Sequence, residues 1–208
     1  MLITATGLGK RFQRDWIFRG LTRAFQPGSA TAVLGPNGAG KSTLLNTISG
    51  QLLPTEGEIT YSLAGRPVTV EDLPRRLAYA APYLELLEEL TLLELLQFHT
   101  QFKPLRPGVS LDTLIELMYL EKSRHQLVRE FSSGMKQRLK LALALYADAP
   151  LLLLDEPTTN LDSAGVAWYQ EHVQATRAGR TLLLSSNVPA EYAFCDEQLL
   201  VTEFQAGR

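Results

Sequence analysis

The chain has 208 residues, enough for one large core, and its charge is nearly balanced, with 20 basic and 22 acidic side chains. Without the basic excess of nucleic-acid binders, we expect no nucleic-acid partner. Glutamates interrupt the leucine-rich run at residues 84–96, which excludes a membrane span, and the single Cys195 excludes an internal disulfide. The first residues carry no signal-peptide pattern, so we expect the protein in the cytosol, at a membrane only through a partner.

In the amino-terminal third, short apolar runs end in glycine or proline, a pattern that predicts strands at residues 2–7, 29–35 and 57–65. The pattern becomes helical at about residue 82. Thr91 and Glu94 have the spacing of a capping box, and Ser110 is expected to begin a helix over residues 111–122.

The strand pattern returns after Pro150, at residues 151–157, 181–187 and 197–203, with one helix-sized segment among these runs. Continuous apolar strands alternating with helices predict an α/β fold with a mostly parallel sheet covered on both faces. We therefore expect one domain over residues 1–208, with a core at 1–81 and 148–208 and a helical subdomain inserted at 82–147.

A glycine-rich motif, "GPNGAGKST", follows an apolar strand and precedes a helical segment. It fits the pattern of a phosphate-binding loop, in which backbone N–H groups and a helix amino terminus converge on phosphate oxygens. Lys41 is placed to reach the β- and γ-phosphates, and Ser42 to bind Mg²⁺. The candidate nucleotide-binding residues here are Gly35, Pro36, Asn37, Gly38, Ala39, Gly40, Lys41, Ser42 and Thr43.

A pair of acidic residues, Asp155 and Glu156, directly follows four leucines. Charged residues at the carboxyl end of a buried strand face the crevice where α/β sheets bind ligands. We expect Asp155 to support Mg²⁺, and Glu156 to orient an attacking water or take its proton. Alone, the pair could also be a solvated strand-end turn. Together with the glycine-rich loop, it predicts nucleotide hydrolysis.

Two further motifs carry a resemblance to a known family. "FSSGMKQR" at residues 131–138 resembles the LSGGQ signature of ABC-type ATPases, and "TTNLD" at residues 158–162 resembles their D-loop. With the two motifs above, the chain resembles the ATP-binding subunit of an ABC transporter over nearly its whole length, and its small size is similar to exporter ATPases of the haem-exporter type. The resemblance implies a P-loop NTPase core with a small amino-terminal antiparallel β subdomain and an inserted helical subdomain.

The resemblance also implies a mechanism. Two cassettes, identical or different, pair head to tail, and ATP with Mg²⁺ is held between the phosphate-binding loop of one and the signature of the other. By this resemblance Asp162 belongs to the D-loop and Phe12 is the aromatic that stacks on adenine, although an isolated Phe is more often a core residue. The signature residues expected to contact ATP are Ser132, Ser133 and Gly134.

Two positions depart from the family. Where the family has a glutamine that reaches Mg²⁺ or the attacking water, this chain has Pro82, which offers neither a ligand nor a backbone donor. Tyr83 or Glu85 could substitute, although both also suit the start of a helix. The histidine that contacts the γ-phosphate is replaced by Asn187, which cannot become cationic. We therefore expect slow but real hydrolysis of ATP to ADP and phosphate.

The leading hypothesis is an ATPase subunit on the cytoplasmic face of a membrane, where ATP-driven dimer closure powers a permease. Leucines between Pro82 and Leu96 could line a groove for a permease helix or simply form the core of the helical subdomain. Two alternatives remain open: a soluble ATP-driven switch acting on ribosomes or DNA, and a regulatory ATP-binding subunit with little turnover. The sequence does not indicate the transported substrate or the direction of transport.

Overall fold

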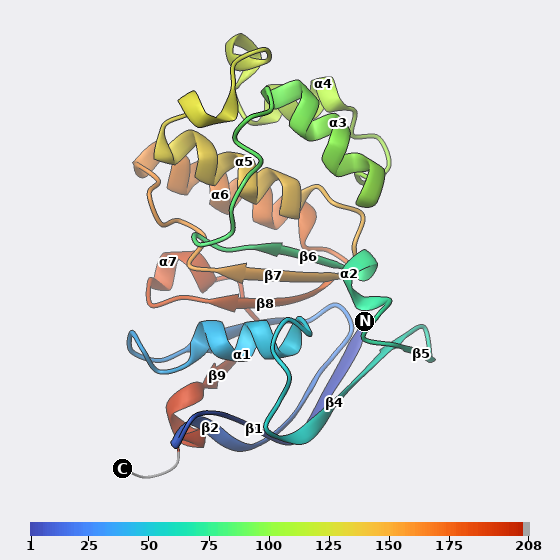
Figure 1. The fold of residues 1–208 in the computed structure, drawn as a ribbon, viewed down its shortest axis with the longest axis vertical. Coiled ribbons are helices and arrows are strands. Elements are labelled where there is room, and N and C mark those ends of the chain that lie inside the picture. Colours follow the sequence, from blue (N-terminus) through green and yellow to red (C-terminus); the bar gives the residue numbers. More distant parts are fainter. Residues whose placement is uncertain (206–208) are drawn as a thin grey trace.

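The computed structural model describes residues 1–205 and contains two sheets (Figure 1). One has four strands in the order β2-β1-β4-β5 with antiparallel pairing, and the other has five strands in the order β6-β7-β8-β3-β9 with parallel pairing. The strands are β1 Leu2–Phe12, β2 Asp15–Phe25, β3 Ala30–Leu34, β4 Glu56–Leu63, β5 Arg66–Val68, β6 Leu77–Ala80, β7 Leu151–Asp155, β8 Thr181–Ser185 and β9 Glu197–Leu200. The predicted α/β fold with a mostly parallel sheet is confirmed.

Helices cover this framework on two sides. In Figure 1 the larger helices lie beyond one face of the parallel sheet, whereas α1 and the antiparallel sheet lie beyond the other. The helices are α1 Lys41–Ile48, α2 Leu73–Arg76, α3 Leu92–Phe102, α4 Leu111–Leu117, α5 Ser133–Leu145, α6 Ser163–Thr176 and α7 Pro189–Tyr192. Three 3₁₀ turns are Glu121–Ser123, Val128–Glu130 and Val201–Phe204.

The leucine run of β7 serves both faces of the parallel sheet. Leu152 and Leu154 pack in the core beneath α3 to α6, whereas Leu151 and Leu153 pack in the core shared with α1 and the antiparallel sheet. All four are fully buried. Successive side chains of a strand point to opposite faces, so only a strand covered on both sides can bury an uninterrupted leucine run.

The antiparallel sheet holds the amino-terminal strand in place. Residues of β1 pair with β2 on one side and with β4 on the other. At Gly57, with φ of +75°, a Cβ would lie 2.4 Å from the carbonyl oxygen of Gly7, so this close approach of β1 and β4 requires glycine. Of these paired strands, β2 was not predicted from the sequence.

The helical part begins later than predicted. Residues 82–90 form no helix, and α3 starts after Thr91, whose side chain accepts from Glu94 N while the Glu94 carboxylate accepts from Thr91 N. The predicted capping box is therefore confirmed. Ser110 caps α4 as predicted, but α4 ends at Leu117 and not at residue 122. Just beyond it, Tyr119 adopts a φ of +57°, which a right-handed helix cannot contain.

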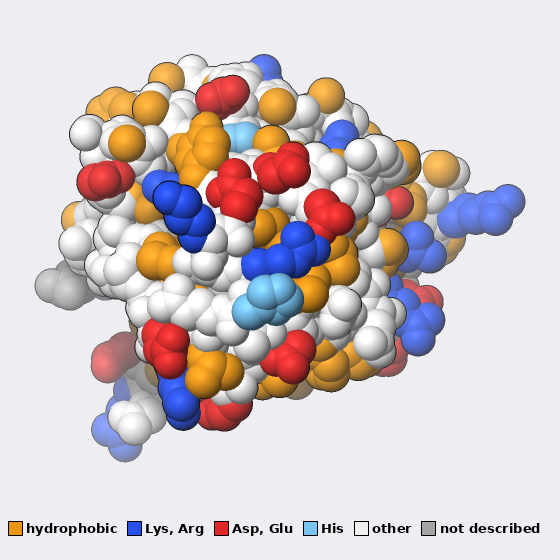
Figure 2. Space-filling view, turned by 90° about the horizontal axis from the view of Figure 1, so that it is seen from above, with side chains coloured by type: hydrophobic (Ala, Val, Ile, Leu, Met, Phe, Trp, Pro, Cys, Tyr) orange, Lys and Arg blue, Asp and Glu red, His pale blue; other side chains and the backbone are white. Residues whose placement is uncertain are grey.

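The strand predicted at residues 197–203 is also shorter. β9 ends at Leu200, and Val201–Phe204 is a 3₁₀ turn. The surface on the helical side carries acidic and basic side chains interspersed with hydrophobic ones (Figure 2). Within residues 1–205, no helix is both long and apolar enough to cross a membrane.

Candidate functional site

Four neighbouring strands deliver polar residues to one edge of the parallel sheet. Their order is β6-β7-β8-β3, and all four run in the same direction. Their carboxyl ends therefore lie side by side, and each continues into a loop at the same edge. β3 leads to the glycine-rich loop, β7 ends at Asp155, β8 leads to Asn187, and β6 leads to Tyr83.

The glycine-rich loop joins β3 to the amino terminus of α1. Gly40 is the N-cap of α1 with φ of +100°, and a Cβ there would lie 2.3 Å from the side chain of Ile17. Lys41 is buried, and its Nζ donates to the carbonyl oxygens of Gly35 at 2.8 Å and Pro36 at 3.2 Å. Backbone N–H groups, a helix amino terminus and an ammonium therefore meet in one loop, an arrangement suited to phosphate oxygens.

Asp155 is 1% exposed, and the adjacent strand supplies it with a hydrogen bond. The hydroxyl of Ser185, directly opposite on β8, donates to Oδ1 of Asp155. A buried carboxylate requires such donors because it loses hydration on folding. Ser185, to which the sequence analysis assigned no role, therefore stabilises the buried Asp155 carboxylate.

Glu156 follows Asp155 in an unusual backbone conformation. Its φ is +43°, uncommon for a residue other than glycine, and its backbone N–H donates to the carbonyl oxygen of Ser185 at 3.0 Å. The chain thus turns sharply at the strand end. Glu156 lines a pocket of about 270 Å³ together with Asn37 and Asn187. Three of the predicted site residues are therefore brought together.

Asn187 lies directly beside the glycine-rich loop. Its Nδ2 is 2.7 Å from Oδ1 of Asn37. Turning the amide by 180° satisfies both of its ends better: Oδ1 then accepts from Lys41 Nζ at 3.2 Å, and Nδ2 donates to the carbonyl oxygen of Gly35. In both orientations the Asn187 amide contacts the loop that is suited to phosphates.

Comparison with known proteins identifies the family. The family described as ABC transporter matches residues 18–159. The chain belongs to the ABC transporter family. Nod factor export ATP-binding protein I of Rhizobium johnstonii is 33% identical over 210 residues, which cover 99% of this chain and 67% of that protein.

Solved structures agree on the fold of this ABC ATPase. A structure of the ATP-binding subunit of an ABC transporter superposes with a TM-score of 0.82 at 29% identity, covering 96% of this chain and 85% of the other. A dimeric ATP-binding cassette in a post-hydrolysis state with ADP and Pi has a TM-score of 0.83 at 21% identity, covering 99% and 97%. The resemblance predicted from the motifs is confirmed.

The signature residues lie at the start of α5. Ser132 is the N-cap, and its hydroxyl accepts from the backbone N–H of Met135 at 3.2 Å. Ser132 and Ser133 are exposed, and Gly134 approaches the carbonyl oxygen of Asn160. Among residues 1–205, no hydrogen bond joins Ser132, Ser133 or Gly134 to the glycine-rich loop. Their contact with ATP stays a prediction.

Two further residues, Asp162 and Phe12, were predicted for the site. Asp162 is the N-cap of α6, and its Oδ1 accepts from the backbone N–H of Gly165 at 2.8 Å. Phe12 is 45% exposed, with the Lys10 ammonium 5.1 Å from its ring centroid. The pocket of about 960 Å³ beside the glycine-rich loop is lined by Trp16 from the adjacent strand. Phe12 is not among the residues that line this pocket, so its role stays a prediction, whereas Trp16 is an aromatic side chain beside the loop.

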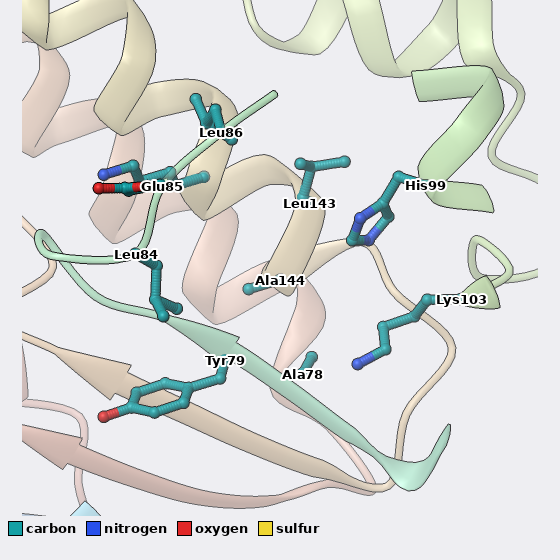
Figure 3. A pocket seen from close by; sticks show the side chains of 10 residues that line it. Ala78, Tyr79, Leu84, Glu85, Leu86, His99, Lys103, Leu143 and Ala144 are labelled. Atoms are coloured by element: carbon teal, nitrogen blue, oxygen red, sulfur yellow. The ribbon is translucent and has the colours of Figure 1, made fainter. Parts of the chain in front are cut away.

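A separate pocket of about 230 Å³ lies between β6, α3, α5 and the segment at residues 84–86 (Figure 3). Leu84, Leu86 and Leu143 give it apolar walls, and His99 of α3 and Lys103, which directly follows α3, project into it. Burial lowers the pKa of the His99 imidazole and of the Lys103 ammonium. Two of the leucines predicted for a groove therefore line a pocket.

Proposed function

We propose that this chain is the ATP-hydrolysing subunit of an ABC transporter. The observation that carries the proposal is the convergence of Lys41, Asp155, Glu156 and Asn187 at one edge of the parallel sheet. The loop from Gly35 to Thr43 would bind the ATP phosphates. Glu156 would orient the attacking water and accept its proton, while Asn187 would contact the γ-phosphate through its amide.

The residues present fit Mg²⁺. Asp155 is a buried carboxylate and Ser42 is a hydroxyl in the first turn of α1, and both offer the hard oxygen atoms that Mg²⁺ prefers. When bound with ATP, Mg²⁺ would neutralise charge that develops on the phosphate oxygens. Ser185 would keep the Asp155 carboxylate in place through the hydrogen bond to Oδ1.

Two cassettes would share each ATP. Ser132, Ser133 and Gly134 stand at the amino terminus of a 13-residue helix on an exposed surface, and a helix of this kind favours an anion at its start. The signature of one cassette would therefore complete the site of the other, and closure would follow ATP binding. Asp162 lies on the turn next to Asn160, close to the signature, where a partner cassette could reach it.

Closure of the two cassettes would drive a membrane permease. The pocket between α3 and α5 combines leucine walls with two ammonium groups, Lys103 and Lys140, and one carboxylate, Glu85. An amphipathic helix of a permease, with apolar side chains and polar groups at its edge, would suit this lining. The cassette would thus be held peripherally on the cytoplasmic face of the membrane.

Turnover is proposed to be slow. Pro82 offers no side-chain ligand, and its carbonyl oxygen accepts from Lys140 Nζ at 2.7 Å, away from the nucleotide loop. Asn187 provides only a neutral contact where a charged one would be stronger. Glu156 is retained, so the chain keeps a group able to activate water.

Phosphate release from the purified chain, with Glu156→Gln as the matched variant, tests the proposal. We expect Mg²⁺-dependent release from the wild-type chain and a loss of about 100-fold or more in the variant, because the amide cannot accept the proton. ATP binding should persist in the variant. Release that is equal in both chains, or absent even with a permease present, would contradict the proposed activity.

A further inference from the structure

A cluster of hydroxyl groups joins the segment after β6 to Asp155. Tyr83 Oη lies 3.1 Å from Oδ2 of Asp155 and 2.6 Å from Oη of Tyr79. Oδ1 of Asn46, on α1, lies 3.0 Å from Tyr79 Oη and 3.3 Å from Tyr83 Oη. The four groups come from β6, the following loop, α1 and β7. In Figure 3 the hydroxyl of Tyr79 points away from the pocket that its backbone borders.

Counting protons assigns the direction of these bonds. Each phenol has one hydrogen, and neither the Asp155 carboxylate nor the Asn46 oxygen can donate. A carboxylate is the strongest acceptor of the set, so Tyr83 donates to Asp155 and Tyr79 donates to Tyr83 or Asn46. A phenol is protonated at neutral pH, so Tyr83 is able to donate.

The two oxygens of Asp155 are therefore held by different hydroxyls. Ser185 donates to Oδ1 from the neighbouring strand, and Tyr83 donates to Oδ2 from the loop. We propose that Tyr83 is a positioning residue for Asp155, occupying with a phenol the place where Pro82 leaves no side-chain ligand. This inference rests on the proposed ATPase function, because Asp155 is the group that would serve Mg²⁺ there.

The same loop borders the pocket between α3 and α5. The next three residues after Tyr83, at positions 84–86, line that pocket. Lys140 Nζ holds the loop from α5 through the carbonyl oxygen of Pro82. The segment that carries Tyr83 is therefore anchored to α5 through Pro82 and borders the pocket through the residues that follow.

Tyr83→Phe tests the proposal because it removes only the hydroxyl, and Tyr119→Phe is the control. Tyr119 is 64% exposed and lies beyond the end of α4. For Tyr83→Phe we expect kcat to fall about five- to tenfold while KM for ATP changes less than about twofold, since Asp155 loses one of two donors. The Mg²⁺ concentration for half-maximal rate should rise about threefold or more. Tyr119→Phe should match the wild-type chain in every measurement.

A second readout needs no turnover. 3-Fluorotyrosine placed at position 83 of the full chain should change its ¹⁹F shift when ATP binds with Mg²⁺, but much less when ATP binds with EDTA. If the chain binds ATP without hydrolysing it, the proposed activity fails, and this Mg²⁺-dependent shift still supports the role of Tyr83. The proposed role of Tyr83 would be overturned by a ¹⁹F shift that is the same with Mg²⁺ and with EDTA, or by kinetics of Tyr83→Phe equal to those of the control.

Discussion

Gln137 Nε2 donates a hydrogen bond of 2.7 Å to the carbonyl oxygen of Pro157. Gln137 is 2% exposed and lies one turn into α5, the helix that begins with the signature residues. Pro157 directly follows Glu156. The bond therefore ties the start of the signature helix to the strand end that carries the candidate general base.

Replacing Gln137 by Leu should lower the free energy of unfolding by about 1–3 kcal/mol, because the buried carbonyl of Pro157 loses its donor. Urea denaturation measures this change. Gln170→Leu is a matched control, since Gln170 Nε2 also donates to a backbone carbonyl, that of Ala190 at 3.0 Å, but at the exposed surface. We expect about 0.5 kcal/mol or less for the control. Equal losses in both variants would show that burial does not decide the strength of the Gln137 contact.

Asn187→Ala should lower the rate of ATP hydrolysis about three- to tenfold, because the loop beside Lys41 loses its amide contact. Asn187→His should raise the rate above that of the wild-type chain, since an imidazolium can make a charge-assisted contact. Phosphate release at saturating ATP measures both, and filter binding measures ATP affinity. If Asn187→Ala leaves turnover and affinity unchanged, Asn187 does not replace the family's histidine.

Cys195 should resist alkylation in the folded chain. Burial raises the pKa of its thiol to about 12, so very little of the folded thiol is ionised at pH 8. Iodoacetamide should therefore modify it slowly in buffer and rapidly in urea, as mass spectrometry would show. Rapid modification of the folded chain would mean that the thiol is accessible and ionised.

The raised pKa of Cys195 also predicts that the stability of the chain depends on pH. The folded pKa lies above the unfolded one, so the contribution of Cys195 to stability is complete below about pH 9 and is lost as pH rises towards about 12. Cys195→Ala should unfold with a weaker alkaline dependence in this window. An identical dependence in both chains would assign it to other groups, such as Tyr61, whose pKa burial raises to about 12.

Much of the fold and site follows from local sequence. The uninterrupted leucines of β7 and β8 can be buried only in a sheet that is covered on both faces. The structure covers one face with α3 to α6 and the other with α1 and the antiparallel sheet. The glycine-rich loop, Asp155 and Glu156 were predicted by their spacing and by their positions at strand ends. The capping box at Thr91 and the cap at Ser110 depend on residues three apart, so sequence also predicted them.

Only the tertiary structure decided which of these residues meet. β8 lies between β7 and β3, which places Ser185 against Asp155 and Asn187 against the glycine-rich loop, although these residues are far apart in the chain. The sequence offered Tyr83 only as one possible substitute for the missing glutamine, because its three hydrogen-bond partners come from other elements. The sequence by itself determined the chemical groups and the local turns that present them. Strand order and non-local hydrogen bonds, which depend on the packing of the whole chain, decided their contacts.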